Sequence, residues 1–273
     1  MRTDESPQCK IRVKQMQLAV KWRHTDDPRC EEGQAMSETG KDYLDKLVQY
    51  YANVQSKIGF ARKCRMHLPA NLEGMCIIDI GCRNGKGVMK LAGNAGSSGY
   101  VLGIDWLPEH VEAAKVYAHE RSSRPKASAP YEFRVGYPEA LGAAGVGEAE
   151  FDAAFVNCSM NLFYDIPQAF AQINRCLKPG GLLIVDGVFA DAPRDDNVVR
   201  RARALDNSVQ AAPALDDFLR MLDQAGFADI DVEMVESVEP DAGFTDETTV
   251  TCVNGIETVG FDVCVVQGHK RLA

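Results

Sequence analysis

The sequence has no excess of basic residues and no long apolar run, and both absences exclude classes of partner. Its 30 Lys and Arg residues stand against 39 Asp and Glu residues, for a net charge of −9. A nucleic-acid groove needs a basic face, so we expect no nucleic-acid partner. No stretch approaches the roughly 18 apolar residues of a membrane span, and Met1–Gln8 is polar, so we expect neither a membrane segment nor a secretion signal.

Cysteine pairs and histidine clusters of the kinds that bind metals are also missing. The nine cysteines form no C-x-x-C pair, which favours free thiols and a cytoplasmic protein. The five histidines show no ligand spacing, so we expect no metal site. A small-molecule substrate is the expectation that remains.

The length and composition predict one α/β domain with an appendage. The chain has 273 residues, of which 45% are hydrophobic and 25% charged. Residues 1–40 are polar and charge-mixed, and we interpret them as an N-terminal helical arm or lid, with a helix over 11–22. Residues 41–273 are expected to form the main domain, whose part after about residue 191 completes the sheet and caps the site.

The segment around which the chain is organised is an apolar run followed by a glycine turn. Cys76–Ile80 predicts a buried parallel strand, and Val88–Ala95 predicts the helix that follows. The glycines between them let a ligand approach the backbone at a helix N-terminus. The turn is neither a P-loop nor a G-x-G-x-x-G fingerprint, because its glycines fall at 81, 85 and 87.

Apolar periodicity predicts the remaining elements as alternating helices and strands. The predicted helices are Asp42–Ile58, His110–Arg121, a helix from Asp165 to Leu177, Val198–Val209 and Asp216–Ala225. The predicted strands are Tyr100–Asp105, Tyr131–Val135, Phe151–Cys158, Leu182–Val188, Ile230–Val238 and Phe261–Gln267. The last strand is expected to run antiparallel between the two before it.

Asp105 ends the second predicted strand, and its position allows two interpretations. A carboxylate there can accept hydrogen bonds from both hydroxyls of a ribose. The same residue can instead cap the helix that begins near Pro108. Trp106, which follows, would lie against a nucleobase under the first interpretation.

The pattern D-x-G-x-x-x-G over Asp79, Gly81 and Gly85 resembles motif I of the class I S-adenosylmethionine (SAM) methyltransferases. Arg83 stands where that motif usually has its middle glycine. The passage Leu177-Lys-Pro-Gly-Gly181 is similarly common in these enzymes. The resemblance implies a Rossmann-like sheet of seven mostly parallel strands with helices on both faces, and SAM as the cofactor.

Three further motifs resemble the arsenite methyltransferase family, over about Tyr50 to Phe227. A Tyr-Tyr pair at 50–51 precedes Cys64; Gly136–Leu141 matches Gly-Tyr-x-Glu-x-Leu; and Asn157–Leu162 is similar to Ser-Asn-Cys-x-x-Asn-Leu. Where the family has a third cysteine, this chain has Ser208. Thiolates suit trivalent arsenic, and a hydroxyl is a poor substitute.

The resemblance implies two sets of site residues. Those expected to act on the acceptor are Asn157, Cys158, Tyr51 and Cys64. Those expected to bind the cofactor are Asp79, Gly81, Cys82, Arg83, Gly85, Asp105, Trp106, Pro138, Glu139 and Asn157. Packing remains an alternative for Tyr51 and Cys158, as does a solvated loop position for Glu139.

Three functions stay open at this point. The first is methyl transfer to a small molecule, arsenite among the candidates. The second consumes SAM without an acceptor: its amine attacks its own γ-carbon and releases methylthioadenosine. The third is a non-catalytic SAM-fold module, which Arg83 and Ser208 would favour and an intact Asp79 and Asp105 would not.

Overall fold

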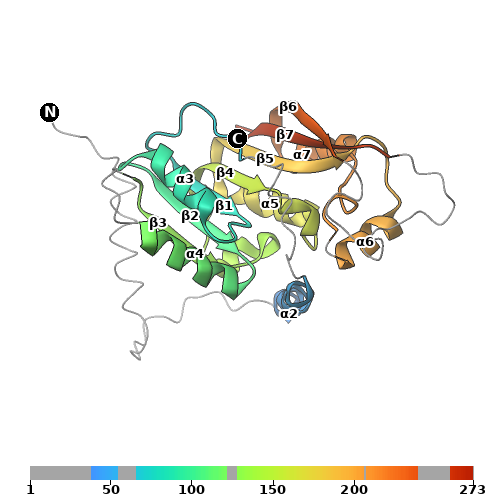
Figure 1. Cartoon of the computed structure of the whole chain (residues 1–273), viewed down its shortest axis with the longest axis horizontal. Coiled ribbons are helices and arrows are strands. Elements are labelled where there is room, and N and C mark those ends of the chain that lie inside the picture. The colour runs from blue at the N-terminus through green and yellow to red at the C-terminus, as the bar shows by residue number, and fades with distance from the viewer. Residues whose placement is uncertain (1–37, 55–65, 122–127, 206, 239–258, 273) are drawn as a thin grey trace.

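A computed structural model describes residues 38–54, 66–121, 128–205, 207–238 and 259–272, and it places a seven-stranded sheet at their centre (Figure 1). The strands are β1 (Cys76–Ile80), β2 (Tyr100–Asp105), β3 (Tyr131–Val135), β4 (Phe151–Asn157), β5 (Leu177–Ala190), β6 (Phe227–Val238) and β7 (Phe261–Lys270). Their order is β3-β2-β1-β4-β5-β7-β6. β7 is antiparallel to both neighbours, and β1 to β5 pair in parallel.

Helices cover both faces of the sheet. The helices are α2 (Glu38–Asn53), α3 (Lys86–Ala95), α4 (Pro108–Arg121), α5 (Ile166–Cys176), α6 (Asp196–Ala204) and α7 (Leu215–Gln224), with 3-10 turns η1 (Pro138–Ala144) and η2 (Met160–Leu162). α3 and α4 contact β1, β2 and β3, whereas α5 and α7 contact each other and β5 or β6. None of the helices in the described ranges is long and apolar enough to cross a membrane.

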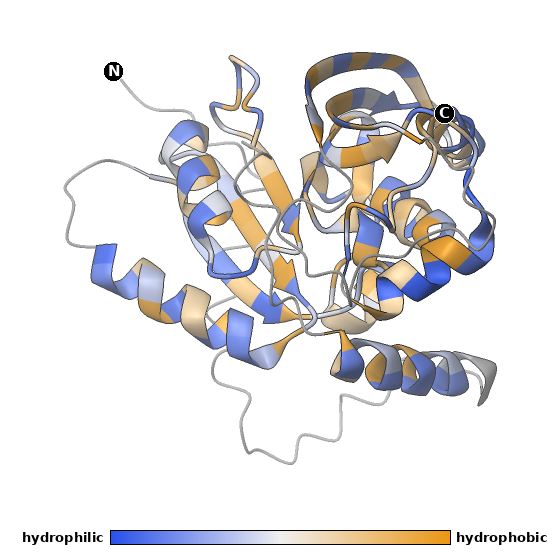
Figure 2. Cartoon of the chain, turned by 45° about the vertical axis from the view of Figure 1, so that its right-hand side comes forward, coloured by the Kyte–Doolittle hydropathy of each residue, from blue (hydrophilic) through white to orange (hydrophobic). Residues whose placement is uncertain are grey.

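The strands form because their apolar residues are buried on two sides. Ile78 and Val156 belong to the cluster beneath α5 and α7, whereas Ile77 and Phe155 belong to the cluster beneath α3 and α4. Figure 2 shows the resulting hydrophobic strands at the centre of the molecule, with mixed colouring along the surrounding helices. The alternation also decides which face each polar residue of a strand occupies.

The predicted fold class is confirmed, including the antiparallel seventh strand. The helix predicted over 198–209 is wrong at its end. The helix stops at Ala204, because the side chain of Asn207 accepts a hydrogen bond from Gln210 N and starts a new turn. Glu139, for which a solvated loop position was one alternative, lies in the 3-10 turn η1. The predicted helix 11–22 lies outside the described residues, and the domain boundary near 40 stays a prediction.

Phe218 should be a major contributor to stability, because it joins α7 to the sheet. Its ring lies 5.2 Å from Phe170 and 5.0 Å from Phe189, and it is 2% exposed. We expect Phe218→Ala to lower the free energy of unfolding by about 3–5 kcal/mol, measured by urea denaturation. Met234→Ala is the control, since Met234 is exposed. Equal losses for the two variants would contradict this packing role.

Candidate functional site

The glycine turn after β1 packs closely against the segment that follows β4, at Ser159. Gly81 has φ 79°, and a Cβ added to it would lie 2.5 Å from Cβ of Ser159. Ser159 in turn donates a hydrogen bond from Oγ to the carbonyl of Ile80. Only glycine allows this close approach, so the turn after β1 and the carboxyl end of β4 form one continuous surface. We call this surface the strand-tip edge. This is the switch point of an open parallel sheet, where ligands bind.

Arg83 takes the left-handed conformation that explains why glycine is usual at its position. Its φ is 47°, and its backbone N–H donates to Asp105 Oδ2 at 2.8 Å. Gly85, with φ 75°, completes the turn through a hydrogen bond to the carbonyl of Cys82. The arginine therefore adopts a backbone conformation that favours glycine, and its N–H bond to Asp105 helps to hold it there. Its predicted contact with the cofactor stays a prediction.

Asp105 is fully buried, and protein groups contact both of its oxygens. Oδ2 accepts from Arg83 N, while Oδ1 accepts from Leu107 N at 3.0 Å and lies 3.0 Å from Nδ1 of His110. These bonds join the β1 turn to the segment that leads into α4, although no bond from Asp105 to a backbone N–H within that helix is seen, so the capping interpretation stays a prediction. The ribose role stays a prediction, and it would require one of these contacts to give way.

A second group of polar residues lies on the face covered by α3. Asp79 is 2% exposed, and its Oδ2 lies near the start of that helix at Gly87. Asn157 ends β4, opposite Asp186 of β5 in the ladder. Oδ1 of Asn157 and Oδ1 of Asp186 are buried and have no hydrogen-bond partner. The carboxyl ends of β4 and β5 thus present acceptor oxygens that the described residues do not use.

Asp186 is the site residue that the sequence analysis missed. Its Oδ2 accepts from the backbone N–H of His67 at 2.7 Å, and burial raises its pKa to about 6. The signal that was available is an aspartate inside the apolar run Leu182–Val188. A charged residue in a buried strand is rare unless it is paired or functional.

Aromatic rings from α2 and from two loops surround the other end of the edge. Tyr51 is buried, with its ring 4.9 Å from Trp106 and 5.4 Å from Tyr137 in a stacked arrangement. Its hydroxyl donates to Glu139 Oε1 at 2.8 Å and accepts from Tyr164 N at 3.3 Å. The structure therefore brings the predicted residues Tyr51, Trp106 and Glu139 together.

Glu139 is a buried carboxylate rather than a solvated loop residue, and burial raises its pKa. Oε1 also accepts from Asp165 N, whereas Oε2 has no partner. The indole N–H of Trp106 is likewise buried and unpaired. Pro138, buried beside Glu139, has no backbone N–H to offer a ligand. An unused acceptor at Glu139 and an unused donor at Trp106 therefore remain in this region, together with the unpaired hydroxyl of Tyr43.

Cys158 and Ser208 both lie near the β4 tip. Cys158 has φ 54°, packs on the cluster containing Val188 and Val209, and is disulfide-bonded. Asn161 Nδ2 donates to the carbonyls of Val188 and Ser208, which fixes residue 208 beside this cluster. Oγ of Ser208 is buried without a partner. Cys64 lies outside the described residues.

Cys82, predicted to bind the cofactor, is buried, and its thiol pKa is raised by that burial and by Asp79 and Asp105. Its predicted contact with the cofactor stays a prediction. No three His, Cys, Asp or Glu side chains in the described ranges gather as metal ligands would.

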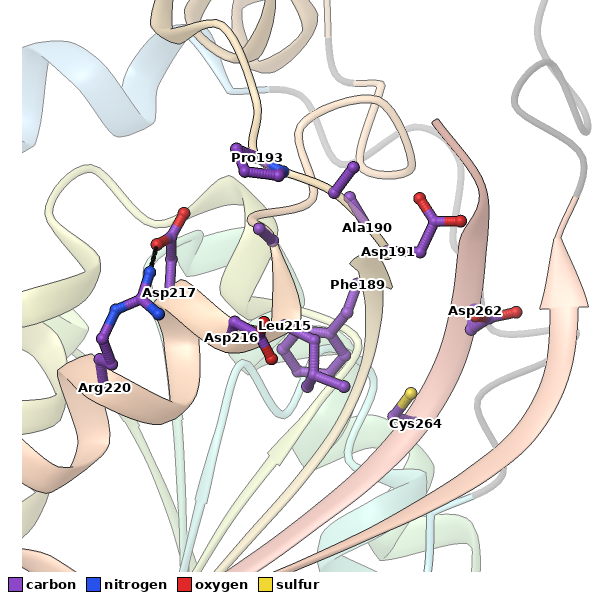
Figure 3. Close-up of a pocket in the computed structure, with 12 residues that line it drawn as sticks. Phe189, Ala190, Asp191, Pro193, Leu215, Asp216, Asp217, Arg220, Asp262 and Cys264 are labelled. Atoms are coloured by element: carbon purple, nitrogen blue, oxygen red, sulfur yellow. Dashed lines mark hydrogen bonds and ion pairs between the residues drawn. The ribbon is translucent and has the colours of Figure 1, made fainter. Parts of the chain in front are cut away.

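A cavity of about 410 Å³ lies elsewhere, between the ends of β5 and β7 and the start of α7 (Figure 3). Phe189 and Cys264 lie at its base, and Asp191, Asp216 and Asp262 contribute carboxylates. It contains none of the predicted site residues. The strand-tip edge, not this cavity, is therefore the candidate site.

Comparisons with known proteins find relatives in sequence and in fold. A family model described as a methyltransferase domain matches residues 71–226. An arsenite methyltransferase of Aquipseudomonas alcaligenes is 31% identical over 61% of this chain and 48% of its own length. The O-methyltransferase cnsE of Penicillium expansum is 31% identical over 62% of this chain and 58% of its own.

A solved structure shows the same fold. The arsenic(III) SAM methyltransferase of Chlamydomonas reinhardtii matches with a TM-score of 0.61 at 22% identity, over 82% of this chain and 73% of that one. The chain spans about half the length, or less, of the arsenite methyltransferases that it matches in sequence.

The Tyr51–Glu139 hydrogen bond should couple α2 to the site. Because it is buried and charge-assisted, we expect the variants Tyr51→Phe and Glu139→Gln to be non-additive in stability by at least about 1 kcal/mol. Urea denaturation of both single variants and the double variant measures this coupling. Tyr50→Phe paired with Glu139→Gln is the control, since Tyr50 donates instead to Leu162 O. Additivity in the first pair would contradict the coupling.

Asp79 should make stability fall as pH rises. Burial, and then the charge of Asp105, raises its pKa from 3.8 to about 7. Between these values the folded state holds a proton that the unfolded state has lost, so the free energy of unfolding decreases with increasing pH. We expect Asp79→Asn to be the more stable protein at pH 8, by roughly 1–4 kcal/mol, with the difference vanishing near pH 4.

Thermal or urea unfolding across this pH range measures the effect of Asp79→Asn. Asp231→Asn, at an exposed strand position, is the control for the loss of a carboxylate. A stability difference that stays constant from pH 4 to pH 8 would show that the Asp79 carboxyl is not held protonated by its surroundings.

Proposed function

The chain belongs to the methyltransferase domain family, whose cofactor is SAM, and on that premise we propose that it methylates a small molecule. The observation that carries the proposal is the strand-tip edge, where a glycine turn, buried acceptor oxygens and an aromatic cluster adjoin one another. Each of these parts suits one part of SAM. The comparisons lend no support to the intramolecular cyclisation or to the non-catalytic module.

The residues present fit the cofactor by their unused hydrogen-bonding groups. Glu139 Oε2 and the indole N–H of Trp106 offer an acceptor and a donor to an adenine edge, which presents both kinds of group. Asp79 and Asn157 offer oxygens to the positively charged end of the molecule. When bound, SAM supplies an electrophilic methyl group on a sulfonium.

The protein's own contribution is positioning and exclusion of water. Transfer of a methyl group requires the acceptor atom to be held in line, about 3–3.5 Å away. The turn at Gly81 and the β4 tip at Asn157 are fixed to each other through Ser159, so the edge is a rigid support. Tyr51 and the rest of the aromatic cluster keep water from its other end.

Two acceptor classes remain within the proposal. Cys158 at the β4 tip favours trivalent arsenic, which thiolates bind. The hydroxyl of Ser208, where the resemblance implies a cysteine, favours an acceptor that needs no third sulfur, such as an oxygen nucleophile. The match to an O-methyltransferase supports the second class as the arsenite methyltransferases support the first.

Product analysis with and without acceptors tests the proposal. The protein is incubated with SAM and a thiol reductant, which reduces the Cys158 disulfide, and then with arsenite or a panel of phenols. We expect S-adenosylhomocysteine only when an acceptor is present. Methylthioadenosine from SAM alone would contradict methyl transfer, and no binding of SAM by calorimetry would contradict an enzyme of this class.

Cys158→Ser separates the acceptor classes. If arsenic is the acceptor, we expect turnover with arsenite to fall by at least about 100-fold while SAM affinity stays the same, because a hydroxyl replaces a metal-binding thiolate. Turnover with an oxygen acceptor should change little. Cys176→Ser is the control, since Cys176 is a buried thiol on α5 outside the site. Loss of arsenite turnover in both variants would point to a folding defect.

A further inference from the structure

Asn157 and Asp186 stand opposite each other on neighbouring parallel strands. Each follows, two residues later, an apolar residue of the cluster beneath α3, namely Phe155 and Ile184. Because side chains alternate along a strand, both polar side chains lie on this α3 face. Opposed residues on adjacent strands have Cβ atoms roughly 5 Å apart, so one small group can contact both.

In the structure neither side chain donates a hydrogen bond to the Oδ1 atom of the other. Oδ1 of Asn157 and Oδ1 of Asp186 are both buried and unpaired, although Oδ2 of Asp186 already accepts from His67 N at 2.7 Å. A buried acceptor without a partner is costly, and a buried carboxylate oxygen more so. Packing does not explain the aspartate, because Ile184 and Val188 beside it on this face are apolar.

The charges around the pair indicate what would satisfy it. Asp79 lies on the same face of β1, the strand on the other side of β4. Lys90 reaches this region from α3, but its Nζ donates to the carbonyl of Met66 at 3.0 Å. The pKa of Asp186 is raised to about 6, mainly by burial and slightly by Glu233, against the lowering effects of His67 and Lys90. A compact cation with several N–H donors fits this surplus of acceptors.

We propose that Asp186, together with Asn157, holds the primary ammonium of the amino-acid arm of SAM, one N–H donated to each Oδ1. This rests on the proposed function and adds to it a residue of β5 that no motif indicated. Asp186 is a cofactor-positioning residue, since the ammonium it holds is not the reacting centre. An ammonium carries three N–H donors and no acceptor, which matches a site made of acceptors.

Ligand binding without turnover tests this proposal. Calorimetry compares S-adenosylhomocysteine with its analogue in which hydrogen replaces the amino group. We expect the wild-type protein to bind S-adenosylhomocysteine at least about 30-fold more tightly, as for a charge-assisted pair of hydrogen bonds. Asp186→Asn should reduce this preference to less than about 3-fold, with the affinity for the analogue unchanged.

Asp186→Asn is an informative substitution because its amide oxygen can still accept from His67 N. Its amide N–H group, in contrast, would face the ammonium and could not accept from it. Asp152→Asn is the matched control. Asp152 also lies in a strand and accepts from a backbone N–H, that of Cys76, at 2.8 Å, but at the opposite end of β4. The control should keep the full preference for the amino group.

The outcomes distinguish a failure of this inference from a failure of the proposed function. If Asp186→Asn keeps the wild-type preference, Asp186 does not hold the ammonium, although the protein binds SAM. If the wild-type protein binds neither ligand, the proposed function itself fails. Should Asp186→Asn not fold, Asn157→Ala replaces it, and an undiminished preference in that variant would equally overturn the proposal.

Discussion

The close contact between the β1 turn and the β4 tip is the constraint on which the site depends. Gly81 leaves no room for a side chain because Ser159 occupies that space, and the serine hydroxyl bonds back to the carbonyl of Ile80. Two segments almost eighty residues apart are thereby held as one edge. Since β5 pairs with β4 in parallel, the position of Asp186 is set by the same contact through the ladder.

Buried carboxylates give the edge its electrostatic character. Asp105 is satisfied by backbone N–H groups and His110, so its charge is stabilised within the protein. Asp79 and Asp186 have fewer partners, and burial raises the pKa of each. Buried acids without partners cost stability, and such groups tend to occur at functional sites. SAM is a cation, so its binding would offset part of the free energy that burying these carboxylates costs.

The sequence predicted those features that follow from local patterns. Apolar runs ending in glycine or an acid indicated the strands, and the family resemblance implied their mostly parallel arrangement. The Tyr51–Glu139 hydrogen bond could not be predicted in this way, because it joins residues 88 positions apart that only the fold brings together. The end of α6 was missed because the Asn207 side chain accepts from the backbone N–H of Gln210, a local bond that competes with a continuing helix. Asp186 was missed because it belongs to no motif, although its charge within an apolar strand was visible.

The difference between the two acceptor classes reduces to one atom at residue 208. Asn161 holds the backbone of Ser208 beside the cluster on which Cys158 packs, so the position is kept even though the sulfur is not. A hydroxyl with a pKa far above neutrality stays protonated and donates a hydrogen bond, whereas a thiolate binds a soft centre directly. Oγ of Ser208 is buried and has no partner, so a nearby acceptor atom on a substrate would satisfy it. Under the proposed function, the hydroxyl of Ser208 would therefore favour an oxygen-bearing acceptor, whereas Cys158 would favour arsenic.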